Sequence, residues 1–482
     1  MNQEISQKFT DEDFFRIREE EVLPQWETGK AIQDMDECIA AAKQLTRGKN
    51  LALGLKAAKK AGRFILIPQF GRALTEYMIE GLQFVESESD IAPEGNWLLY
   101  SDSYTRKNDY ARAAVGIETS HKEGMSMLNG WPVANFGVEE ARRITEASSL
   151  PLQYVTCDED ARLAAEIVMA AGWTSAGLTP LQESIAHSKD MPMATLIRLK
   201  QYTARLSGIY EEKGVPQAPM NASHLTGYDS PGFHVLAHVT SAVLAAEQGV
   251  KCQFLSHGLN MNLIQDIAMI RVTEKLSYEY CARFGHQDVE FITGSFPFLG
   301  AWAPGEDEAN AMIAWNTIIP IMGGFPGVIL KCQDEARATP TKEGMAHSVR
   351  QARHMLRLMG TQRLAESDAL VDEEAMIELE VRAVLDKSLE VADGDMAVAL
   401  CAGVEAGWID TMVTPWKYNN GKVLLVRDGD NALRYMDSGD LPLPGEVKEY
   451  HTEKIARREA RDGRRADMGM VVEDIQFASI MP

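Results

Sequence analysis

Short apolar runs alternate with longer stretches of helical periodicity through the middle of the chain. The apolar runs predict eight strands, at residues 63–68, 97–102, 125–129, 150–155, 216–222, 252–257, 289–294 and 327–332. The helical stretches that follow several of them lie at 160–171, 193–213, 233–248, 263–284 and 342–359. This alternation is typical of an α/β protein, and eight is the strand number of a (β/α)8 TIM barrel.

A doubly wound open sheet would show the same alternation, so the loop after the first strand is informative. In a dinucleotide-binding fold that loop carries G-x-G-x-x-G, and in a P-loop protein it carries a Lys-Ser/Thr pair. Here the strand ends in Gln69-Phe70-Gly71-Arg72, which has neither pattern. The sequence therefore favours the barrel.

The alternation of predicted strands and helices is absent at both ends of the chain. Residues 11–26 mix charged and apolar side chains in a way that predicts an amphipathic helix. After residue 360 we expect helices at 372–389 and 395–406, a strand pair at 422–426 and 433–436, and a charged helix from 449. We therefore predict an N-terminal helical arm (1–55), a barrel that holds the functional site (56–360) and a C-terminal α+β region (361–482).

The amino-acid composition indicates which binding partners and which cellular compartment to expect. The 482 residues include 48 Lys and Arg against 70 Asp and Glu, a net charge of −22 that repels nucleic acid. No clean apolar stretch predicts a membrane span, and the first residues do not resemble a secretory signal. The six cysteines form no C-x-x-C pair. We expect a cytoplasmic protein.

In a barrel, the residues that follow each strand build the active site. Here they form a ring of polar side chains: Gln69, Arg72, residues 102–106, Asn129, Thr156, Ser223, His224, Ser256, His257, Ser295, Lys331, Asp334 and Glu335. For most single members, a loop residue bonded to a neighbouring strand end is the simpler interpretation. The pair His234 and His238 has helical spacing but no Glu between, so we read partly buried histidines and predict no metal site.

Two segments of this ring indicate more specific chemistry. Arg106 follows the second strand, where its guanidinium could bind a carboxylate through two hydrogen bonds; the alternative is a salt bridge within its loop. Lys331 and Glu335 follow the last strand and could hold the hydroxyls of a ribose or another sugar. The alternative there is a solvated ion pair worth about 0–1 kcal/mol.

Seven stretches of sequence carry a resemblance to a known family. They are YTRKN (104–108), LNGWPVANFG (128–137), LPLQ (150–153), AEIVMAAGWTS (165–175), AAEQGVK (245–251), IQDIA (264–268) and PTKEG (340–344). On these, the chain resembles the large (epsilon) subunit of adenosylcobalamin-dependent glutamate mutase, also called methylaspartate mutase, from about residue 10 to about 475. That family folds as a (β/α)8 barrel.

The resemblance implies an isomerase that rearranges a carbon skeleton by radical chemistry, in the family from L-glutamate to 3-methylaspartate. It implies adenosylcobalamin as cofactor. Lys331 and Glu335 match positions that hold the adenosyl group, and Gly71 and Asn129 match positions at the cobalamin-facing mouth.

The resemblance also implies a partner protein. The family's cobalamin-binding motif, Asp-x-His-x-x-Gly, does not occur in this chain. As in two-component members, we expect it on a separate small (sigma) subunit, with a homodimer of this chain inside a heterotetramer.

The positions that match the family's substrate site differ from its pattern. Its three arginines correspond to Gln69, Arg106 and Val155, so only one is kept. Its glutamate and two tyrosines correspond to Gly177, Glu183 and His187, and a phenylalanine to Ala222. Arg72 is a candidate replacement, although it should start a helix and point elsewhere.

These differences suggest a mutase whose substrate is a different amino acid or carboxylate, because a buried dicarboxylate without its cations is costly. Two alternatives stay open at this point. One is true glutamate mutase activity with a rearranged clamp, and the other is a catalytically silent barrel that serves as scaffold for a cobalamin-carrying partner.

Overall fold

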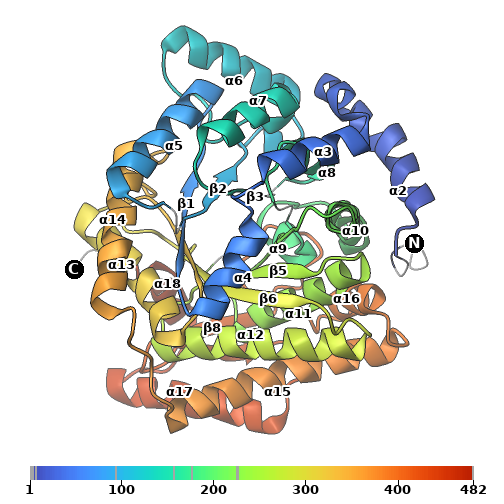
Figure 1. The fold of residues 1–482 in the computed structure, drawn as a ribbon. Helices are drawn as coiled ribbons and strands as arrows, with labels where there is room; N and C mark the ends of the chain where they lie inside the picture. The colour runs from blue at the N-terminus through green and yellow to red at the C-terminus, as the bar shows by residue number, and fades with distance from the viewer. Residues whose placement is uncertain are drawn as a thin grey trace.

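The computed structural model describes residue 5 and residues 8–92, 95–155, 158–174, 177–223 and 227–479. Seven parallel strands in these residues form one sheet, in the order β3-β2-β1-β7-β6-β5-β4, which curves into a barrel (Figure 1). They are β1 (Ile65–Phe70), β2 (Trp97–Tyr100), β3 (Leu152–Val155), β4 (Met220–Ser223), β5 (Cys252–Gly258), β6 (Glu290–Phe296) and β7 (Gly327–Leu330). The predicted barrel class is confirmed.

The two edge strands of this sheet, β3 and β4, are joined by a segment that the sequence pattern missed. Thr174 forms a parallel bridge with Gln153 of β3. The N–H of Leu178 donates to the carbonyl oxygen of Met220 in β4 (3.2 Å). Thr174 and Leu178 thus stand where an eighth strand belongs in a closed barrel.

One predicted strand, at 125–129, is wrong. These residues form an irregular link between helices α6 (Tyr110–Glu123) and α7 (Val133–Ala147). Met125 and Met127 are exposed, and Leu128 packs with Ala73 and Leu74 outside the sheet. A short apolar run can cover another loop as well as it can enter a sheet, so periodicity alone could not separate the two.

The barrel interior is a packed apolar core. Ile65, Ile67 and other inward residues of the strands share one cluster with Leu51 and Leu55 of α4 (Leu51–Ala61). Val155 and Phe296 belong to the same cluster at the carboxyl ends of the strands. A cavity at that end therefore has a closed apolar floor.

Helices cover the outside of the barrel. They are α5 (Thr75–Ser89), α6, α7, α8 (Arg162–Ala170), α10 (Met193–Glu212), α11 (Pro231–Glu247), α12 (Leu263–Arg283), α13 (Glu306–Gly323) and α14 (Lys342–Met359), with a short α9 (Pro180–Ala186) at the rim. Among the described residues, none of the helices combines the length and apolar character needed to cross a membrane.

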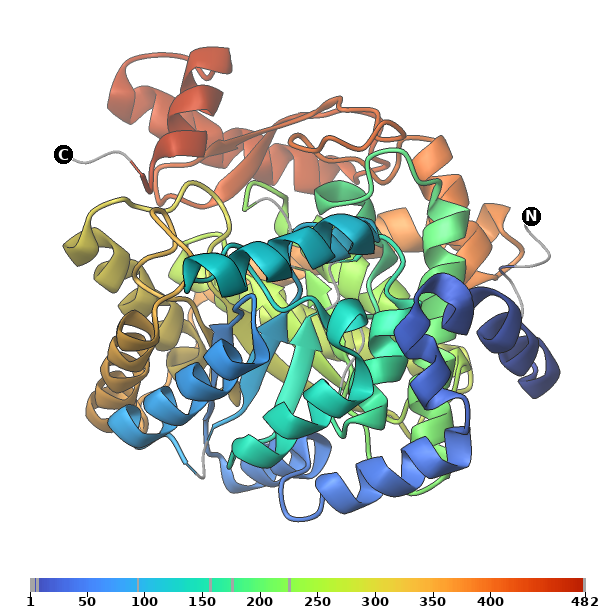
Figure 2. The ribbon, with the colours of Figure 1, turned by 90° about the horizontal axis from the view of Figure 1, so that it is seen from above.

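The N-terminal segment lies against one side of the barrel (Figure 2). The helix expected at 11–26 is interrupted: α2 (Asp11–Ile17) is followed by a π-helical turn (Arg18–Val22) and by 3-10 turns at Leu23–Gln25 and Glu27–Ile32. Pro24 explains the change, since it cannot donate within a helix. Arg18 is buried and its Nε donates to Glu166 (3.1 Å) on α8. Helix α3 (Met35–Leu45) completes this segment.

The last part of the chain packs on the outer face of α12 (Figure 1). Its elements are α15 (Asp368–Val391), α16 (Met396–Glu405), the antiparallel pair β8 (Val423–Arg427) and β9 (Leu433–Ser438), α17 (Gly445–Asp462) and α18 (Met468–Gln476). The buried guanidinium of Arg434 binds Glu373 and Asp428, both at 2.7 Å. The expected helices and strand pair are present, while the division into three regions stays a prediction.

Candidate active site

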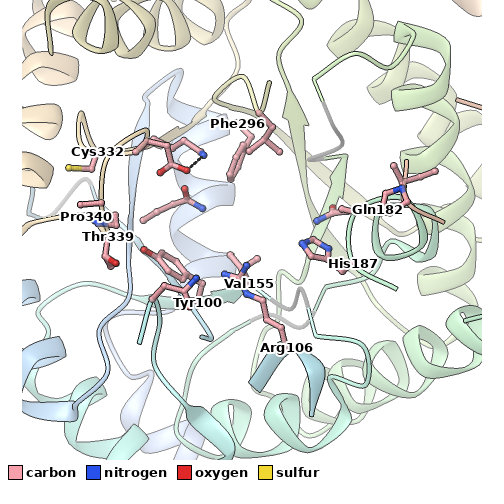
Figure 3. A pocket seen from close by; sticks show the side chains of 18 residues that line it. Tyr100, Arg106, Val155, Gln182, His187, Phe296, Cys332, Thr339 and Pro340 are labelled. Atoms are coloured by element: carbon pink, nitrogen blue, oxygen red, sulfur yellow. Dashed lines mark hydrogen bonds and ion pairs between the residues drawn. The ribbon is translucent and has the colours of Figure 1, made fainter. Parts of the chain in front are cut away.

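A cavity of about 660 Å³ opens at the carboxyl ends of the barrel strands (Figure 3). Strands β1, β2, β3 and β6 reach its wall with Gln69, Tyr100, Val155 and Phe296. The remaining lining residues come from loops and from α9: Arg106, Asn129, Gln182, Ile185, Ala186, His187, Leu299, Lys331, Cys332, Glu335, Ala338, Thr339, Pro340 and Pro415. The volume suits a small organic ligand, for which pockets span roughly 300–1,000 Å³.

This cavity brings together most of the residues singled out from the sequence. Seven of them line it: Gln69, Arg106, Asn129, Val155, His187, Lys331 and Glu335. Gly71, Gly177 and Glu183 do not line it. Of the polar ring, Thr156 and His224 lie outside the described residues.

Arg106 sits on a short 3-10 turn (Thr105–Lys107) directly after β2. Asp102 begins this turn, because its Oδ1 accepts from the N–H of Tyr104 (2.8 Å). The Nε of Arg106 donates to the carbonyl of Ser101 (3.1 Å), and its guanidinium lies 5.8 Å from the ring centroid of Tyr100. The backbone therefore holds the guanidinium at the cavity wall.

The opposite wall carries an ion pair. Lys331 donates to Glu335 four residues later, and its Nζ lies over the rings of Phe296 and Trp302, 6.0 and 5.6 Å from their centroids. Lys331 is buried while Glu335 is half-exposed. The pair is thus better shielded from water than a solvated surface pair.

Asn129 and Gly71 shape the mouth between these walls. The side-chain oxygen of Asn129 accepts from the N–H and Oγ of Ser103 (2.9 and 3.0 Å), so its amide hydrogens are directed elsewhere. Gly71 lies behind Tyr100: a Cβ there would come within 2.7 Å of the Tyr100 ring and 3.0 Å of the Gly130 Cα. Gly71 therefore lets Tyr100 and the Asn129 loop approach each other.

Helix α9 places His187 at the cavity and Glu183 behind it. The Nδ1 of His187 is 3.9 Å from Glu183 Oε2, and Lys200 Nζ on α10 is 3.5 Å from Glu183 Oε1. Burial raises the pKa of Glu183 to about 7, against the pull of Lys200. Burial, with Arg106, Lys200 and Lys107 nearby, lowers the pKa of His187 to about 3. His187 is therefore neutral at physiological pH.

Gly177, His257 of the polar ring and the pair His234 and His238 have structural roles. The carbonyl of Gly177 accepts from Thr203 Oγ1 (3.5 Å). His257 is buried outside the cavity, with Nδ1 3.3 Å from the Gly294 oxygen. His234 and His238 are fully buried rather than partly exposed, since α11 presses them against β4.

A comparison with protein families agrees with this geometry. The model of the family "Methylaspartate mutase E chain (MutE)" matches residues 45–480. The chain belongs to this family. It is a family of carbon-skeleton isomerases, and its match spans the barrel and the C-terminal elements.

Full-length relatives support the assignment. A protein named glutamate mutase epsilon subunit from Desulfitobacterium hafniense is 38% identical over 96% of this chain and 95% of its own length. Proteins of the same name from Escherichia coli O157:H7 and Haloarcula marismortui are 36% and 31% identical, over 99% and 98% of this chain and 98% and 95% of their own lengths.

Two positions that we expect, from the resemblance, to match arginines of the family have no cationic side chain. Gln69 and Val155 both line the cavity, next to Arg106. Arg72 does not line it; its guanidinium donates to the carbonyl of Pro340 and lies 5.7 Å from the ring centroid of Phe70. In this methylaspartate mutase family member, Arg106 and Lys331 are the cationic side chains among the described lining residues.

Tyr100 and Gln182 are among the lining residues that the sequence analysis did not single out. Tyr100 is the last residue of β2, but its apolar neighbours mark it as part of a strand core. Gln182 lies on α9, the helix after the segment that was not predicted as a strand, so no predicted strand end indicated it. Knowledge of where β2 ends relative to its neighbours would have indicated Tyr100. Nothing in the local sequence indicates Gln182.

Proposed function

We propose that this chain is the catalytic large subunit of an adenosylcobalamin-dependent carbon-skeleton mutase. Membership of the methylaspartate mutase E chain family supports the reaction type, and the relatives' name, epsilon subunit, supports a multi-subunit enzyme. Because the chain lacks Asp-x-His-x-x-Gly, a separate small subunit carries that motif and the cobalamin. The active assembly contains two copies of this chain.

The residues of one cavity wall fit an adenosyl group. A ribose hydroxyl both donates and accepts hydrogen bonds. Lys331 uses one ammonium hydrogen on Glu335 and keeps two, the Glu335 carboxylate accepts, and the amide hydrogens of Asn129 are available. When bound, adenosylcobalamin supplies the radical chemistry.

The other groups of the cavity bind and shield the substrate. Arg106 binds a substrate carboxylate, since its guanidinium is held at the wall by Ser101 and Tyr100. The apolar floor at Val155 and Phe296 keeps water from the reacting carbon atoms.

The substrate carries one carboxylate rather than two. This follows from the charges of the cavity, which is the observation that carries the proposal. Arg106 and Lys331 are the cationic side chains among the described lining residues, Lys331 is paired with Glu335, and His187 is uncharged. A second carboxylate would face Gln69 and Val155 and would lose its hydration without gaining a counter-ion.

An anaerobic assay tests the proposal. The chain is combined with its small subunit and adenosylcobalamin, and L-glutamate is compared with amino acids that have uncharged side chains. We expect cob(II)alamin, measured by electron paramagnetic resonance, with one of the latter and not with glutamate. Formation of 3-methylaspartate from glutamate would refute the changed substrate, and silence with every compound would favour the scaffold alternative.

A further inference from the structure

A buried set of three ionisable side chains lies behind the α9 wall of the cavity. Gln182, Ile185 and Ala186 of α9 face the cavity, while Glu183 points to the other side, towards Lys200 of α10. The side chains of Glu183 and Lys200 are only 2% and 5% exposed. His187, at the end of α9, is the third member of this set and also lines the cavity.

None of the three facing atoms has a hydrogen-bond partner among the described residues. Glu183 Oε2, His187 Nδ1 and Lys200 Nζ are all buried, although each group can form strong hydrogen bonds. The separations of 3.9 Å and 3.5 Å are slightly too long for a hydrogen bond. A small rotation of the Glu183 side chain would bring its carboxylate within hydrogen-bonding distance of either His187 Nδ1 or Lys200 Nζ.

The two ring nitrogens of His187 face different surroundings. Nδ1 is buried beside Glu183, yet the side chain retains 25% exposure and lines the cavity (Figure 3). The edge that carries Nε2 is therefore the one that meets the cavity. In a neutral imidazole one nitrogen donates and the other accepts, so the partner of Nδ1 decides the role of Nε2.

We propose that Glu183 and Lys200 are positioning residues that set the tautomer of His187, and thereby whether its cavity-facing Nε2 accepts or donates a hydrogen bond. With Glu183 ionised beside Lys200, Nδ1 carries the proton and donates to the carboxylate, which leaves Nε2 as an acceptor. With Glu183 protonated, the carboxyl donates to Nδ1, and Nε2–H becomes a donor. Protonation of Glu183 takes up one proton and leaves the imidazole neutral.

The charges around this set agree with such a switch. Arg106, Lys107 and Lys200 all disfavour an imidazolium, so His187 stays neutral throughout. Asp158 is buried and accepts from Ser101 Oγ (2.6 Å), and its carboxylate disfavours ionisation of Glu183. Lys200 and Arg106 favour ionisation of Glu183. With its pKa at about 7, Glu183 changes state near neutrality.

The switch would act on substrate recognition, and only this consequence rests on the proposed function. In the ion-paired state, Nε2 can receive a hydrogen bond from an N–H or O–H group of a substrate whose carboxylate is held by Arg106. In the protonated state the same atom would repel that donor. The ligand-free protein should already show the switch.

Nitrogen-15 NMR of the full chain, with labelled histidine and without cofactor, partner or substrate, tests the proposal. His187 is assigned from its loss in His187→Asn. We expect its Nδ1 to be protonated at pH 8.5 and its Nε2 at pH 5.5, with a midpoint near 7. A tautomer that does not change over this range, or an imidazolium within it, would overturn the proposal. The measurement is independent of the reaction, so failure of the proposed function would not affect it.

Two substitutions assign the roles. Glu183→Gln should abolish the pH dependence of the tautomer, since an amide does not titrate. Lys200→Met should move the midpoint upward by about one pH unit or more, because an opposite charge lowers a carboxyl pKa by roughly 1–3 units. Lys213→Met, an exposed lysine after the same helix, is the matched control and should change nothing. A midpoint unaltered by Glu183→Gln would overturn the assignment, even if Lys200→Met does not fold.

Discussion

The two walls of the cavity are built on different backbone. The wall with Lys331 and Glu335 follows β7, a central strand whose neighbours β1 and β6 both pair with it. The wall with Gln182 and His187 belongs to α9, which lies at the rim between the two edge strands. One wall is thus fixed by the sheet, and the other by side-chain packing on α10 and α11.

This difference suggests how one fold can keep a cofactor site and change a substrate site. The strand-borne wall carries the ion pair of Lys331 and Glu335, which we propose holds the adenosyl group. The wall on α9 has Glu183, His187 and a buried Lys200, whose charges depend on one another. A short helix at the rim can be rebuilt with little effect on the sheet, since the described contacts give residues 180–186 of α9 no ladder hydrogen bond with a strand.

The largest expected effect concerns Arg106, which we propose binds the substrate carboxylate. Arg106→Ala should lower kcat/KM by roughly 10²–10³-fold, because it removes the counter-ion of a desolvated carboxylate. The affinity for adenosylcobalamin should stay within about twofold, since the guanidinium lies on the substrate side. Arg112→Ala, whose side chain is 73% exposed on α6, is the control. An equal loss of cofactor affinity would contradict the separation of the two walls.

A smaller effect is expected on the strand-borne wall. Lys331→Ala should weaken adenosylcobalamin binding about tenfold, since a hydrogen bond to a charged group contributes roughly 1.5–3 kcal/mol. The affinity is measured by titrating the assembled enzyme with the cofactor. Arg337→Ala in the same loop, a half-exposed arginine, should have no such effect. Unchanged affinity in Lys331→Ala would remove this residue from the cofactor site.

Introducing a cation at position 69 should change which substrates are accepted. Gln69→Arg should raise kcat/KM for L-glutamate about tenfold relative to the unaltered chain, because a second carboxylate gains a bidentate partner. Gln69→Lys should gain less, since an ammonium lacks the planar fork. If both variants leave glutamate unused, the charge of the cavity is not what excludes it.

The smallest effect is on stability. The pKa of Glu183 is raised in the folded state, so the native protein holds this proton while the unfolded chain releases it above about 4.3. Stability therefore falls as pH rises from about 4.5 to 7, by at most about 1.4 kcal/mol per pH unit for this group. Glu183→Gln should flatten that part of the profile of the free energy of unfolding, measured by denaturant titration. Glu449→Gln, at an exposed position, should leave the slope as it is.

The sequence was sufficient for most of the barrel. Seven of the eight predicted strands overlap β1 to β7, because a buried parallel strand is apolar on both faces and is bounded by polar turns. The failure at 125–129 and the missed bridge at Thr174 share a cause. A run that covers a loop and a segment that joins two edges differ in their neighbours in space, which local periodicity does not contain.

Some residues of the candidate site could likewise be predicted from the sequence, and others could not. Residues at or shortly after the end of a strand, such as Gln69, Arg106 and Lys331, could be named because parallel strands end at one face of the barrel. Gln182 and Lys200 could not, since both lie within helices and meet the site only through the packing of α9 on α10.

By itself, the sequence determined the barrel class, the family and the set of strand-end side chains, since periodicity and residue order are properties of the chain. Only the tertiary structure decided that Arg72 donates to the carbonyl of Pro340 and does not line the cavity, that Gly71 makes room for Tyr100, and that Lys200 stands behind Glu183. Charge, burial and tautomer depend on distances of a few ångströms between segments far apart in sequence, and those distances exist only in the folded protein.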